Sequence, residues 1–161
     1  MDVSTLTLQL NASFGVAQRN LADVSHEESL LSPGSGGNCL NWIAGHLMAS
    51  RNDLLEVLGK QRLWGKEHDE LYRRGSEPIT AANARPLAEL TQAFRDSHEA
   101  VLSSLQAVTP ERMAEPAPFS PGNNPDETVG TLLALFAFHE AYHVGQTGVL
   151  RRVCGHPGAI G

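Results

Sequence analysis

The sequence has 161 residues, of which 41% are hydrophobic and 19% charged, so it can bury one sizeable core and is not typical of a disordered chain. Its formal net charge of −6 repels phosphate backbones and anionic lipids, so we expect neither nucleic acid nor a membrane as a partner. No apolar run is long enough to cross a bilayer, no secretory signal is recognisable, and the two cysteines, Cys39 and Cys154, are too few for a disulfide framework. These features predict a cytoplasmic protein with reduced thiols.

The first predicted helix covers residues 5–25, because apolar residues recur there at spacings of three and four. The glycine-rich segment 32–37 then predicts a loop; it has neither the preceding strand nor the following lysine of a phosphate-binding loop. The second predicted helix covers residues 38–58, with Asn38 as its N-cap and Gly59 at its end.

A long crossover is predicted over residues 60–83, where charged residues are interspersed with single apolar ones. The third predicted helix follows Pro86, a residue tolerated in the first turn, and ends at the Thr-Pro pair 109–110. Four prolines within residues 116–125 then predict a loop.

The fourth predicted helix has the best-marked start, because the motif Asn-Pro-Asp-Glu at 124–127 offers a cap, a first-turn proline and two acids at the positive end of the helix dipole. It ends before Gly155. No segment alternates with period two for long enough to be a convincing strand. The sequence therefore predicts an all-α fold, a four-helix bundle, and one domain over residues 1–161.

Two histidines lie on the apolar face of this last helix. His139 and His143 are four residues apart and so stack on one side of the helix. Buried imidazoles need partners for their ring nitrogens, and a metal provides them, because neutral imidazole binds Zn, Ni, Cu or Fe. The alternative is a pair of core histidines bonded to neighbouring groups. For a third ligand, His46 in the second helix is the best candidate, and His98 in the third is its competitor.

The segment 139–143 also matches the His-Glu-x-x-His pattern of zinc proteases, in which the glutamate is the general base. The continuation of those enzymes is missing: positions 146 and 149 hold Gln146 and Val149, and no glutamate follows Glu140. The protease interpretation is therefore disfavoured. Glu140 points about 100° away from His139 around the helix axis. It is expected either to be solvated or to hydrogen-bond a metal-binding histidine without touching the metal.

Two further residues are candidates for supporting the metal ligands. Gln146 lies three residues beyond His143 on the same face, where it could bond a ligand histidine. Asp53 lies seven residues beyond His46, on its side of the helix, although a surface charge is the plainer interpretation. The sequence assigns no catalytic residue.

The residues around these histidines resemble a known family. Segment 41–47, Asn-Trp-Ile-Ala-Gly-His-Leu, resembles the Trp-x-x-x-His-Leu/Ile segment of the DinB/YfiT-like superfamily, and segment 139–146 resembles its His-x-x-x-His-x-Gly-Gln signature. The resemblance implies an up-down-down-up four-helix bundle with a long crossover between the second and third helices. It also implies a metal held by His46, His139 and His143, which favours His46 over His98.

The resemblance further implies a homodimer and a choice of activities. Some members of the family are transferases or isomerases that use low-molecular-weight thiols such as bacillithiol or mycothiol, and others are candidate hydrolases. Three neutral ligands leave open positions on a metal, which is typical of a catalytic site. We therefore expect a divalent transition metal (Zn, Ni or Fe), with a low-molecular-weight thiol as a second cofactor, and thiol transfer to a small electrophile. The alternatives are a metal-dependent hydrolase and a non-catalytic stress-response protein that binds metal or ligand.

Overall fold

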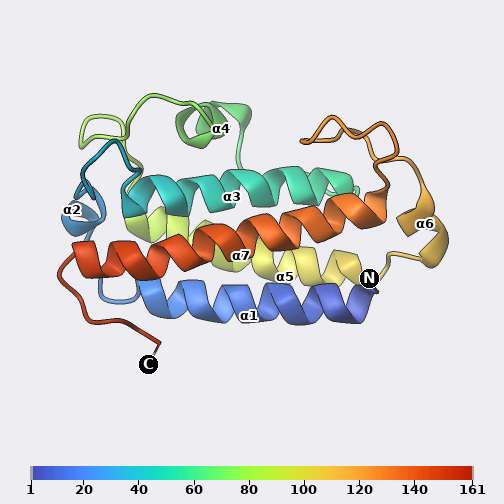
Figure 1. The fold of residues 1–161 in the computed structure, drawn as a ribbon, viewed down its shortest axis with the longest axis horizontal. Helices are drawn as coiled ribbons and strands as arrows, with labels where there is room; N and C mark the ends of the chain where they lie inside the picture. Colours follow the sequence, from blue (N-terminus) through green and yellow to red (C-terminus); the bar gives the residue numbers. More distant parts are fainter. Residues whose placement is uncertain (1, 161) are drawn as a thin grey trace.

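The structure, a computed structural model, describes residues 2–160 and contains no strand within that range, only one isolated bridge between Pro116 and Thr128. Four long helices form a bundle and three short ones lie at its ends and side (Figure 1). In chain order the helices are α1 (Val3–Leu21), α2 (His26–Ser29), α3 (Leu40–Val57), α4 (Lys66–Tyr72), α5 (Leu87–Leu105), α6 (Pro110–Ala114) and α7 (Val129–Val153). The predicted all-α bundle is confirmed.

The four long helices close into a ring, in which α1 contacts α5 and α7, and α3 contacts the same two helices. In Figure 1, α1 and α7 run toward the end of the bundle where α2 lies, and α3 and α5 run the opposite way. This is the up-down-down-up order that the family resemblance implies. The parallel pair α3 and α5 requires a long crossover, which carries α4 along the outside of α3 (Figure 1).

The first helix is shorter than its apolar pattern predicts. It ends at Leu21, because Asp23 adopts a left-handed conformation with φ of 61°. Ser25 and Glu28 then form a reciprocal capping box that starts α2 as a separate short helix.

The second long helix has its start one residue later than predicted. Cys39, and not Asn38, is the N-cap of α3, and it makes no side-chain capping bond. The predicted end is confirmed, since Gly59 takes up the left-handed conformation (φ 74°) that only glycine adopts without strain.

Between α5 and α7 the predicted helix boundaries were wrong in two places, both next to prolines. The third long helix, α5, ends at Leu105, before the Thr-Pro pair that was expected to end it, and Thr109 and Pro110 instead start α6, with Thr109 as the N-cap. The last helix begins at Val129 under a Thr128 cap, not at 124–127, because the Asn124 side chain accepts from the Asp126 N–H and closes a turn instead.

Buried apolar side chains fill the bundle along its whole length in two clusters, one around Trp42, Leu47 and Phe94 and the other around Leu55, Val101 and Leu132. Within residues 2–160 no helix has both the length and the hydropathy needed to cross a membrane.

Candidate metal centre

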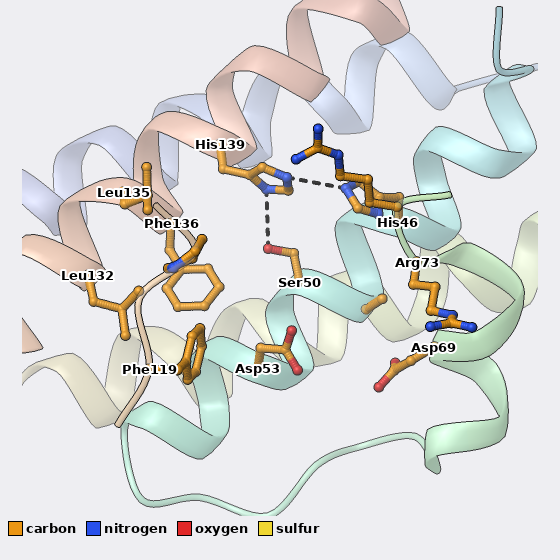
Figure 2. A pocket seen from close by; sticks show the side chains of 13 residues that line it. His46, Ser50, Asp53, Asp69, Arg73, Phe119, Leu132, Leu135, Phe136 and His139 are labelled. Atoms are coloured by element: carbon orange, nitrogen blue, oxygen red, sulfur yellow. Dashed lines mark hydrogen bonds between the residues drawn. The ribbon is translucent and has the colours of Figure 1, made fainter. Parts of the chain in front are cut away.

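Three histidines from two helices meet at the side of the bundle. His46 comes from α3, and His139 and His143 come from successive turns of α7. Their candidate ligand atoms all lie within 4.8 Å of one another, and His46 Nε2 lies 3.2 Å from His139 Nε2. Figure 2 shows His46 and His139 turned toward each other from their two helices.

The orientation of His46 is fixed by the crossover. Its Nδ1 donates to the backbone carbonyl of Tyr72 at 2.7 Å, which directs Nε2 toward the other two rings. Tyr72 is fully buried and packs so closely on α3 that a Cβ added to Gly45 would lie 2.2 Å from its ring. The glycine one position before His46 therefore lets the crossover reach the histidine.

The two histidines of α7 are oriented in the same way. His143 Nδ1 lies 2.7 Å from Oε1 of Gln146, and His139 Nδ1 lies 3.3 Å from Oγ of Ser50. Each ring thus has a partner at Nδ1, and each Nε2 is left for the shared centre. Partners of this kind are what hold metal-binding imidazoles in one tautomer.

Burial keeps these rings in the neutral form. Desolvation, together with the nearby rings of His143 and His46, lowers the pKa of His139 to about 4. Desolvation also lowers the pKa of His46 and of His143, against the raising effect of their hydrogen bonds to Tyr72 and Gln146. Neutral imidazole is the form that binds a metal ion.

The cluster fits a divalent transition metal. It is the one group of three His, Cys, Asp or Glu residues within 2–160 whose ligand atoms come close enough to share an ion. All three donors are imidazole nitrogens, the ligand type that suits Zn, Ni and Fe, and three protein ligands leave coordination positions open.

The three supporting candidates and the competitor ligand lie in different surroundings. Gln146 contacts His143, as described above. Within residues 2–160 Asp53 makes no hydrogen bond or ion pair with a histidine; its carboxylate pairs with Arg62 at 3.0 Å. His98 lies apart from the cluster, stacked on Phe14 with 3.8 Å between ring centroids.

Glu140 is neither solvated nor turned toward the histidines. Its carboxylate forms a two-pronged ion pair with Arg51 of α3, with Nε–Oε2 and Nη2–Oε1 distances of 2.5 and 2.9 Å. The side chains are 1% and 5% exposed. Sequence reasoning missed this pair because nothing local links Arg51 to α7.

Ser50 and Tyr72 were also missed. Ser50 lies one helical turn beyond His46, a spacing that could have marked it as a neighbour. No local signal marks the Tyr72 carbonyl, since it reaches His46 only through the crossover.

Two cavities meet at the histidine cluster, and both are lined by His46, His139, Arg74 and Pro121. The smaller, of about 320 Å³, has an apolar wall formed by Phe119, Leu132, Leu135 and Phe136. The larger, of about 740 Å³, is lined by residues of α3, α7 and the loop before α3, including Trp42, Tyr142, His143 and Gln146. The histidine cluster therefore borders two cavities, each large enough for a small molecule.

The comparisons with known proteins show the family and the fold. The family model of the DinB superfamily matches residues 9–147. The fold is similar to the crystal structure of a conserved protein from Enterococcus faecalis, with a TM-score of 0.71 over 96% of this chain and 98% of that one. At 16% sequence identity this likeness shows the fold alone. No curated protein matches the sequence.

Proposed function

The chain belongs to the DinB superfamily, and from this premise we propose that it is a metal-dependent transferase that moves a low-molecular-weight thiol onto a small electrophile. The observation that carries the proposal is the convergence of three neutral histidines whose Nδ1 atoms are already partnered. His46, His139 and His143 would hold the ion.

The residues around the cluster suit a reaction between two small molecules. A divalent ion held there would lower the pKa of a bound thiol, so that the thiol would lose its proton to solvent near neutral pH. The three histidines are neutral donors and would not offset the positive charge of the ion. The two cavities, both lined by His46 and His139, offer separate places for the thiol and the electrophile. The apolar wall of the smaller cavity offers a surface for the apolar part of an electrophile.

Metal content tests the premise of the mechanism. Elemental analysis of untagged protein is expected to find nearly one Zn, Ni or Fe per chain in wild type and to find it lost in His46→Ala, His139→Ala and His143→Ala. His98→Gln is the matched control, because His98 is also buried but lies outside the cluster and should leave the metal in place. Absence of metal from wild type after reloading with each ion would sink the metalloenzyme proposal.

Two assays on metal-loaded protein separate the transferase from its alternatives. Thiol transfer is followed with 1-chloro-2,4-dinitrobenzene, where the sulfur of cysteine or bacillithiol displaces chloride. Hydrolysis is followed with 4-nitrophenyl acetate in the absence of thiol. Turnover in the first assay that is lost in His143→Ala supports the transferase, and turnover only in the second favours the hydrolase. Metal without turnover in either assay favours a non-catalytic binding protein.

A homodimer and a cytoplasmic location are further parts of the proposal, as is one domain over residues 1–161. The outward face of α7 carries Phe138, Tyr142 and Val149, which are 67%, 58% and 63% exposed, at the spacing of one helical stripe. Both cysteines are free, in keeping with a reducing compartment. Sedimentation analysis of wild type and Phe138→Lys tests the dimer, which the variant is expected to lose.

A further inference from the structure

We propose that Arg74 is a binding residue for the carboxylate of an amphipathic substrate whose apolar part occupies the smaller cavity. The inference rests on the proposed function, because it names the class of electrophile that reaches the histidine cluster. Arg74 lines both cavities together with His46 and His139, so a group bound to it lies beside the metal centre.

The acidic groups of the smaller cavity already have a cationic partner other than Arg74. Asp53 and Asp69 both line the cavity, and Arg62 pairs with both of them, at 3.0 Å from Asp53 and in direct contact with Asp69, and also with Glu56 at 2.7 Å. Neither of the two cavity carboxylates pairs with Arg74.

Arg74 differs from the arginine beside it. Arg73 pairs with Glu70 at 3.0 Å, one turn earlier on α4. Within residues 2–160, Arg74 makes no hydrogen bond or ion pair, although it faces both cavities. It is thus the cavity-lining charge that remains available to an anion, and a guanidinium matches the geometry of a carboxylate.

The backbone around Arg74 is anchored on both sides to α3. Two residues before it, the Tyr72 carbonyl accepts from His46; two residues after it, the Ser76 hydroxyl accepts from the indole N–H of Trp42 at 2.9 Å. Trp42 and His46 also stack on each other, with 4.6 Å between ring centroids. The turn that carries Arg74 is therefore held in place against the ligand histidine, which reduces the entropy lost on binding.

Four neighbouring side chains give the smaller cavity an apolar wall. Figure 2 shows Phe119, Leu132, Leu135 and Phe136 grouped on one side of His139. Phe119 and Phe136 meet edge to face at 6.3 Å, and Phe119, from the loop before α7, is 43% exposed and available to cover a ligand.

These two ends define the ligand by its chemistry. A carboxylate at Arg74 and an alkyl or aryl group among the phenylalanine and leucine side chains place the atoms between them next to His46 and His139. A volume of about 320 Å³ is at the lower end for small-molecule sites, so the ligand is short. Low-molecular-weight thiols are strongly hydrophilic and suit the larger cavity better.

Calorimetric titration of zinc-loaded protein with octanoate and with 1-octanol tests the proposal. Octanoate carries the charge and octanol has the same chain length without it. We expect octanoate to bind, and Arg74→Met to weaken it by about tenfold or more while leaving octanol unchanged, because the variant loses a charge-assisted contact and keeps the apolar stem. Arg73→Met is the matched control and should leave both affinities near wild type. Phe119→Ala should weaken both ligands.

Three results would overturn the proposal. The first is the absence of measurable heat when octanoate is added at millimolar concentration. Equal losses in the Arg74 and Arg73 variants would indicate only a general positive potential. Affinity unchanged in Arg74→Met but lost on zinc removal would place the carboxylate on the metal instead.

The zinc content of each preparation and a titration of His143→Ala keep this test separate from the proposed function. His143 lines only the larger cavity. If His143→Ala binds octanoate and the additional change Arg74→Met weakens that binding, the carboxylate site is supported even where zinc is absent. Whether the protein is a metalloenzyme is decided by the metal analysis alone.

Discussion

At the scale of single residues, the partner of each imidazole Nδ1 decides what the other ring nitrogen can do. The backbone carbonyl of Tyr72 accepts from His46 Nδ1 and so directs His46 Nε2 toward the other two rings. The side-chain carbonyl oxygen of Gln146 does the same for His143. A carbonyl oxygen can only accept, so these two rings must carry their proton on Nδ1 and are preset as ligands.

Gln146→Ala is expected to weaken zinc binding by roughly ten- to a hundredfold, because His143 loses the acceptor that fixes its ring. Competition with a chromophoric chelator measures this affinity. Asp53→Ala is the control: Asp53 bonds to Arg62 and to none of the histidines, so its removal should leave zinc affinity near wild type. The same loss in both variants would show that Gln146 has no specific role.

At the scale of helices, the relative position of α3 and α7 decides whether the histidines meet. Arg51 and Glu140 join these two helices next to the cluster, since Glu140 directly follows His139. Arg51 also lies over the Phe94 ring at 4.5 Å from its centroid, which links the pair to α5. The pair therefore limits sliding of one ligand-bearing helix along the other.

Arg51→Met is expected to lower the free energy of unfolding by about 3–5 kcal/mol, because Glu140 is left as an unpaired buried charge. Urea denaturation measures the loss, and zinc affinity should fall with it. Replacing both partners, as Arg51→Met with Glu140→Leu, should restore most of the stability, since no buried charge remains. A single variant as stable as wild type would contradict a structural role for the pair.

The contact between α3 and the crossover is tested at Gly45. Gly45→Ala places a methyl group against the Tyr72 ring and is expected to cost about 1–3 kcal/mol by overpacking. It should also weaken zinc binding, because Tyr72 can no longer approach His46. Gly145→Ala is the matched control: apart from its chain neighbours and the nearby backbone of its own helix, no atom of residues 2–160 lies within 4 Å of the added methyl group, so the helix should be stabilised by about 0.5–1 kcal/mol. Thermal unfolding of both variants distinguishes the two sites.

At the scale of the whole molecule, buried neutral histidines make the metal-free protein sensitive to acid. Burial and the neighbouring Arg51 charge lower the pKa of His98 to about 4, against about 6.5 for an unfolded histidine. Above pH 6.5 both states are neutral and the pKa difference has no effect. Between pH 6.5 and 4 the unfolded state binds a proton on this histidine and the folded state does not. The free energy of unfolding therefore decreases as the pH is lowered through this range.

His98→Gln is expected to reduce this acid sensitivity by on the order of 1–3 kcal/mol between pH 7.5 and 4.5, measured by urea denaturation in a chelator. Glutamine can still donate to the Asn11 side chain, which His98 Nε2 meets at 3.0 Å. The variant should lose some stability at pH 7.5, because the stacking on Phe14 is gone, but less at low pH. An unchanged difference between the two pH values would contradict the shifted pKa.

Local patterns were enough to predict the four long helices, because an apolar repeat of three and four residues can be buried only as a helix face. The end of α3 at Gly59 was likewise a local property. The starts of α6 and α7 were not, since Pro110 and Asn124 each support either a turn or a helix start, and the surrounding chain selects between them.

The sequence by itself determined the family, the bundle and the pairing of His139 with His143, because their four-residue spacing places both on one helix face. The helix pattern alone left both His46 and His98 open, and the family resemblance favoured His46. Only the tertiary structure decided that His46 lies beside the other two histidines, and that Tyr72, Ser50 and Arg74 surround the same point. The reason is physical: these residues lie on segments whose relative positions depend on how the helices and the crossover pack, and no local spacing encodes that packing.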